Sequence, residues 1–187
     1  MSTSERILVY SVGFILGMGL VSILVLRRTA PHAGSEDPWQ HHLHASQAAA
    51  VEALPNNVEV AMLKGHPMAF GYLPSAADPQ QRVWLLHFDE SYPFVRVVEE
   101  LSDGKLTYMA ADQIKIRLQP QVDVTELAPM LEALQLRLRN FNRKHHIAIV
   151  GVIDTQIDAV PRTLKAIQPW SELFVSADVD GIEFRSH

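Results

Sequence analysis

Residues 7–26, ILVYSVGFILGMGLVSILVL, form a run of twenty residues without a charged side chain, closed by Arg27 and Arg28. As an α-helix this run is about 30 Å long, which matches the hydrocarbon core of a bilayer. Its apolar side chains fall on every face of that helix, whereas a surface helix of a soluble domain keeps a polar face. The run therefore predicts a single transmembrane helix.

A cleaved signal peptide is the alternative interpretation of this run. Signal peptides have a shorter apolar centre of about 7–15 residues and a small-residue cleavage site, which only TAPHAG, residues 29–34, imitates here. Positive charges leave the orientation open, because Arg6 and the terminal amine oppose Arg27 and Arg28. We expect a single-pass protein of the cell membrane, with its soluble part on either side.

Gly13 and Gly17 have the GxxxG spacing that allows two transmembrane helices to approach closely. The spacing predicts a homodimer formed through the membrane helix. The alternative is coincidence, because glycine is common in such helices. The lipid bilayer and a second copy of the chain are thus two expected partners.

Charge and composition exclude several classes of function. The formal net charge is -5, and no basic cluster is present of the kind that nucleic-acid binding requires. The chain has no cysteine, which removes disulfides, thiolate catalysis and cysteine-based zinc sites. We expect no nucleic-acid partner, no metal and no cofactor.

The sequence divides into five segments. They are a short N-terminal tail (1–6), the transmembrane helix (7–26), a juxtamembrane linker (27–57), a small antiparallel β region (58–111) and an α+β domain (112–187). The linker contains His41, His42 and His44, but neighbouring histidines in a flexible stretch bind metal ions only loosely. We interpret them as part of a solvated linker.

The region 58–111 reads as strands separated by turn-forming residues. The expected strands are VEVAMLKG (58–65), RVWLLHFD (82–89), YPFVRVVEEL (92–101) and KLTYMAAD (105–112). Asp103-Gly104 is a hairpin turn signal between the last two. The aromatic residues of this region are expected to fill the core of the sheet, with an aromatic binding surface as the alternative: Trp84, Phe88, Tyr92 and Phe94.

The region 112–187 alternates strands and helices. The expected order is strand (113–118), helix (123–135), strand (136–142), strand (147–152), helix (159–167) and strand (172–179). That order predicts a ferredoxin-like βαββαβ sandwich, in which two helices cover one face of a four-stranded antiparallel sheet.

Two stretches, ADQIKIRLQPQVDVTELAPMLEALQLRLRNFNRKHHIAIVGV and DAVPRTLKAIQPWSELFVSADVD, resemble the propeptide domain of subtilisin-like serine proteases. The resemblance covers about residues 112–180 and rests on pattern and order. It implies a domain that packs against a protease, assists its folding and inhibits it. It also implies a partner-binding edge in the last strand, at Leu173, Phe174, Val175, Ser176 and Ala177. No protease domain accompanies these residues in this sequence.

No catalytic motif is present. His87 and Asp89 share one face of an expected strand while Glu90 lies on the other, so no converging third group completes a reactive site. We therefore expect no enzyme, but a membrane-anchored, non-catalytic interaction module that inhibits or assists a partner, a protease being one candidate. The alternatives are a small-ligand sensory or accessory domain of a membrane system, and a hydrolase with an unrecognised site.

Overall fold

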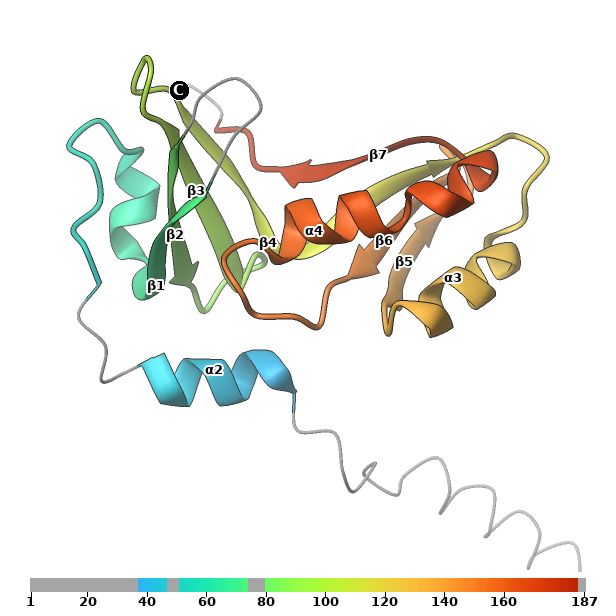
Figure 1. The fold of residues 1–187 in the computed structure, drawn as a ribbon, viewed down its shortest axis with the longest axis horizontal. Helices are drawn as coiled ribbons and strands as arrows, with labels where there is room; N and C mark the ends of the chain where they lie inside the picture. Colours follow the sequence, from blue (N-terminus) through green and yellow to red (C-terminus); the bar gives the residue numbers. More distant parts are fainter. Residues whose placement is uncertain (1–36, 47–50, 74–79, 185–187) are drawn as a thin grey trace, which may run out of the picture. The chain divides into compact units, whose positions relative to one another are not determined.

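Seven antiparallel strands dominate the computed structural model, which describes residues 37–46, 51–73 and 80–184 (Figure 1). The strands are β1 (His66–Leu73), β2 (Gln81–His87), β3 (Phe94–Glu100), β4 (Leu106–Leu118), β5 (Arg137–Asn142), β6 (Ile147–Gly151) and β7 (Phe174–Gly181). The α-helices are α2 (Pro38–Ser46), α3 (Ala128–Ala133) and α4 (Ala159–Ala166). Three short 3-10 helices are η1 (Val60–Lys64), η2 (Val124–Leu127) and η3 (Gln168–Leu173).

β4 is the strand on which the whole sheet depends. Its first half pairs with β3, its second half pairs with β6, and β7 pairs with both halves. Met109 lies between β3 and β7, and Ile114 lies between β6 and β7. Between these two positions the register with β7 shifts, and residues 109–112 are all buried. Such a bulge bends a strand, so one continuous β4 serves two groups of neighbours.

The predicted fold class is wrong. The order predicted for residues 112–187 is present as β4, α3, β5, β6, α4 and β7, but β4 begins at Leu106 and continues the β1–β3 hairpins. The chain therefore forms one seven-stranded, mostly antiparallel sheet with few helices, instead of a small β region followed by a ferredoxin-like sandwich. The boundary expected between residues 111 and 112 falls inside β4, where the buried carboxylate of Asp112 pairs with Arg139 at 2.6 Å.

Among residues 37–46, 51–73 and 80–184, no helix combines the length and apolar character needed to cross a membrane. The predicted transmembrane helix (7–26), with Gly13 and Gly17, lies outside the described residues. The structure gives no support to a single-pass membrane protein.

Two further elements differ from the prediction. Residues 60–64, expected in a strand, form η1, which places Met62 in the core and leaves Val60 and Leu63 exposed. The turn-rich segment that follows forms β1, whose register with β2 shifts next to Pro67. Proline is tolerated at bulges and on edge strands because its missing N–H is not needed there.

The hairpin half of the sheet, β1–β3 with the first half of β4, buries side chains on both faces. On one face, Trp84 and Val97 pack against Met62 of η1. On the other face, Leu85 and Phe94 pack against Trp39 of α2. The C-terminal half has its own core, in which β4 and β6 pack against the helices: Ile114, Ile116, Leu118, Leu127, Met130, Val150, Val160 and Ile167.

Candidate functional site

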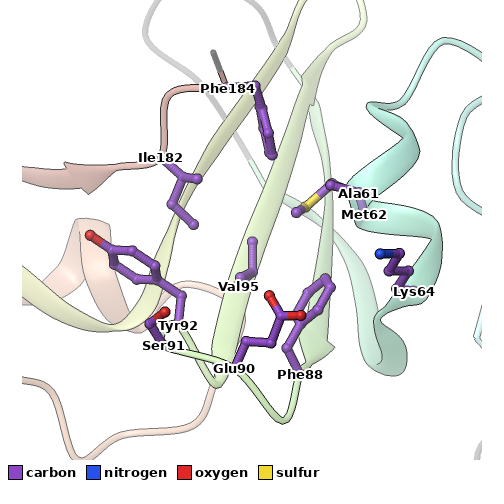
Figure 2. Close-up of a pocket in the computed structure, with 10 residues that line it drawn as sticks. All are labelled: Ala61, Met62, Lys64, Phe88, Glu90, Ser91, Tyr92, Val95, Ile182 and Phe184. Atoms are coloured by element: carbon purple, nitrogen blue, oxygen red, sulfur yellow. The ribbon is translucent and has the colours of Figure 1, made fainter. Parts of the chain in front are cut away.

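A cavity of about 170 Å³ opens on the face of the hairpin half that η1 covers (Figure 2). Its floor is Val95 of β3, and its walls come from η1, from the β2–β3 loop and from the residues after β7. Seven of the lining side chains are apolar or aromatic: Ala61, Met62, Phe88, Tyr92, Val95, Ile182 and Phe184. The predicted core role is confirmed for Trp84 and Phe94, whereas Phe88 and Tyr92 line this pocket.

Gly65 fixes the wall formed by η1. It ends η1 in an extended conformation that any residue can adopt, with its N–H donating to the carbonyl of Met62. The Phe88 ring lies over it so closely that a Cβ at position 65 would be 2.5 Å from Phe88 Cζ. Glycine is therefore required here for close approach, and this approach brings Phe88 against η1 and into the pocket wall.

The β2–β3 loop supplies the polar side of the pocket. The loop is closed by the N–H of Phe88 donating to the carbonyl of Pro93 at 2.7 Å. Burial, and then the negative charge of Asp180, raise the pKa of the Tyr92 hydroxyl above its usual range. Tyr92 therefore stays protonated at neutral pH and can donate a hydrogen bond to a ligand.

The residues after β7 form the remaining wall. The N–H of Ile182 donates to the carbonyl of Tyr108 at 2.9 Å, so the chain stays bound to β4 beyond the end of β7. The Phe184 ring then packs edge-on against the Tyr108 ring, with centroids 5.1 Å apart. The residues that directly follow β7 thus form part of the pocket wall.

Lys64 and Glu90 are exposed and flank the pocket from η1 and from the loop (Figure 2). Around the apolar lining of the pocket they place one positive and one negative group, and the Tyr92 hydroxyl adds a hydrogen-bond donor. This arrangement suits a ligand with an apolar side chain next to backbone or polar groups. The apolar lining contacts the side chain, and the polar groups at the rim bind the backbone or polar groups.

The predicted partner edge lies at the beginning of β7. Leu173 ends η3, Phe174 is buried in the C-terminal core, and Val175 is 58% exposed. Within the described part of the chain, β7 pairs with one strand, β4. Its other edge can accept a further strand, and the role of residues 173–177 in binding a partner stays a prediction.

The other candidate groups do not converge on the pocket. His87 packs against Phe94, with ring centroids 5.4 Å apart, while Glu90 lines the pocket. His41 is exposed, and burial lowers the pKa of His42. Within residues 37–46, 51–73 and 80–184, no three histidine or acidic side chains lie close enough together to hold a metal ion.

Sequence reasoning missed most of the pocket. Ile182 and Phe184 lie beyond the last expected strand (172–179), and Met62 and Lys64 lie in the segment 58–65 that was expected to be a strand. The one available signal was the alternation of Ile182 and Phe184, which continues the period-two pattern of β7.

We predict that Gly65→Ala will lower the free energy of unfolding by about 1–3 kcal/mol, because the added methyl group overpacks a closed site. The Cβ would also lie 3.1 Å from Leu86 Cβ, so the Phe88 ring has to move and the pocket wall shifts. Equilibrium unfolding in urea measures the loss. Gly181→Ala is the matched control, since nothing lies within 4 Å of a Cβ there. Equal stability of the two variants would contradict the prediction.

Comparison of the chain with protein-family models, with curated proteins and with solved structures finds no match.

Proposed function

We propose that this chain is a non-catalytic protein-interaction module that binds an extended segment of a partner protein. The segment pairs with the outer edge of β7 and places an apolar side chain in the pocket lined by Phe88, Ile182 and Phe184. The observation that carries the proposal is the continuity of an available strand edge with an apolar pocket.

The energetics of strand addition support this proposal. A peptide that extends a sheet gains backbone hydrogen bonds along the edge, and a pocket for one side chain gives specificity. β7 offers eight residues, from Phe174 to Gly181. The exposed Val175 lies on this strand, and such an apolar residue at an edge favours pairing over isolation.

The resemblance to protease propeptides supplies the class of partner. We propose a subtilisin-like serine protease, held through β7 in the way that the resemblance implies. The chain would then inhibit or assist a protease that is a separate molecule.

An inhibition assay tests the proposal. The full chain is mixed with subtilisin-like proteases, and the rate at which they hydrolyse a peptide substrate is measured. We expect inhibition at micromolar protein, and an inhibition constant about tenfold higher for Val175→Lys, because a lysine on an edge strand opposes pairing. Leu138→Lys is the matched control, since Leu138 is 41% exposed on β5. No inhibition at micromolar protein excludes a protease as the partner, and equal effects of the two lysines exclude β7 as the edge.

A second candidate function, binding of a small ligand by an accessory domain, is favoured by a different observation. A further pocket lies between the β1–β4 strands and the elements α4 and β7.

A further inference from the structure

This further pocket has a volume of about 240 Å³ and lies on the opposite face of the hairpin half from the Phe88 pocket. The two faces are distinguished by neighbouring residues of β3, since Val95 lines one pocket and Arg96 lines the other. Val98 and Met109 of the sheet face Leu164 of α4 and Val179 of β7 across it. Most of its lining is therefore apolar.

Arg96 is the unusual group in this pocket. It lies in the middle of β3, paired with Leu85 and Met109 of the flanking strands, and is 4% exposed. Its Nε has no hydrogen-bond partner, and within the described part of the chain no ion pair includes Arg96. Asp158, at the start of α4, is the acidic group that acts on it from a distance.

The guanidinium is nevertheless charged. Burial lowers the pKa of Arg96 to about 10, and the negative charge of Asp158 opposes that shift. A group with this pKa is protonated at neutral pH. A buried cation without a hydrogen-bonded counter-ion is unfavourable, and an anion in the pocket would relieve that cost.

The opposite end of the pocket is acidic. Glu100 lies on the same face of β3, four residues and about 13 Å along the strand from Arg96. Its Oε1 accepts a hydrogen bond from Gln81 Nε2 at 2.5 Å, but its Oε2 is buried without a partner. Val98 separates the two charged residues and gives the pocket an apolar middle.

We propose that this pocket binds a small ω-amino carboxylate. The carboxylate pairs with Arg96, the alkyl chain lies over Val98, and the ammonium group donates to Glu100. Such a ligand satisfies both unpartnered polar atoms at once, while its chain matches the apolar lining. The proposal rests on the second candidate function and names its class of ligand. It does not depend on partner binding, which uses the outer edge of β7 and the Phe88 pocket, whereas Val179 of β7 lines this pocket from the face of the sheet.

Titration calorimetry on the full chain tests this, with ε-aminocaproate as the probe and caproate and hexylamine as its two halves. We expect saturable binding of ε-aminocaproate, weaker binding of caproate and the weakest binding of hexylamine. Absence of saturable heat with ε-aminocaproate, or equal affinity for all three compounds, overturns the proposal.

Two variants separate the roles of the ends. Arg96→Met keeps an unbranched side chain of similar length, and we expect binding of both carboxylates to weaken at least about tenfold without loss of stability in the absence of ligand. Glu100→Gln should weaken ε-aminocaproate but not caproate. If Arg96→Met is less stable or does not fold, then a group of the chain itself already balances the charge of Arg96, and the proposal is overturned. Unchanged selectivity in Glu100→Gln overturns the assignment of the ammonium end.

Discussion

Replacing Trp39 with alanine is expected to lower the free energy of unfolding by about 3–5 kcal/mol, the range typical of removing a buried aromatic side chain. Trp39 is 2% exposed and packs on the Phe94 ring, with centroids 4.7 Å apart. Its Nε1 also donates to the buried carbonyl of Val152 at 2.9 Å. The substitution therefore creates a cavity and leaves a buried acceptor without its partner, and both effects destabilise the fold.

Trp39→Phe separates these two contributions. It keeps most of the apolar area and loses the hydrogen bond, so we expect a smaller loss of about 1–3 kcal/mol. Equilibrium unfolding of the full chain in urea measures both variants. A loss below about 1 kcal/mol for Trp39→Ala would show that α2 does not stabilise the sheet, since surface substitutions usually stay within about 0.5 kcal/mol.

Trp39 also shows where local pattern was insufficient. Residues 27–57 look like a linker because prolines, histidines and small residues dominate them, and no periodicity marks α2 as part of a core. α2 is held by one large side chain that reaches a site formed by residues far away in the sequence, including Phe94 and Val152. A contact of this kind leaves no repeating signal along the chain.

Elements with strong periodicity were predicted well. The strands expected at 82–89, 92–101 and 147–152 and the helix at 159–167 are confirmed as β2, β3, β6 and α4, and every end agrees within two residues. Each carries its own apolar pattern, because one face or both faces are buried. β1 was missed since HPMAFGYL is rich in residues that also form turns.

The candidate sites were harder to predict than the strands, for a physical reason. The Phe88 pocket is assembled from η1, the β2–β3 loop and residues 182–184, which meet only once the sheet has formed. The partner edge was expected from a resemblance. Whether β7 has an unpaired edge depends on the order of the strands in the sheet. The burial of Arg96 could not be predicted either, because YPFVRVVEEL predicts a strand equally well whether its arginine faces solvent or a pocket.

Replacing Arg139 with methionine is expected to cost about 2–4 kcal/mol at neutral pH, because it leaves the buried carboxylate of Asp112 without its cation. Asp112 is 2% exposed and lies in the bulged middle of β4, where its carboxylate meets the Arg139 guanidinium at 2.6 Å. Arg139 is 39% exposed, which reduces the expected loss, since water partly screens the pair. The Arg139 guanidinium also donates to Gln113 Oε1 at 2.9 Å, so the variant loses a second contact at the same bend.

The pH dependence of that loss distinguishes the charge from the packing. Burial raises the pKa of Asp112 above its ordinary value of 3.8, Arg139 opposes the shift, and Asp37 adds to it. Because the folded-state pKa is raised, the contribution of Asp112 to stability is fully present below 3.8 and is lost as the pH rises through the folded-state pKa. Removal of Arg139 moves that pKa still higher.

The stability deficit of Arg139→Met should therefore be small near pH 4 and widen toward pH 7, as measured by urea unfolding at several pH values. Adding Asp112→Asn to Arg139→Met removes the titrating group and should flatten this dependence, while the loss of packing remains. A deficit that stays constant across the pH range would mean that Arg139 acts through its contact with Gln113 and through packing alone. In that case, the continuity of β4 through Asp112 would not depend on the neutralisation of its charge.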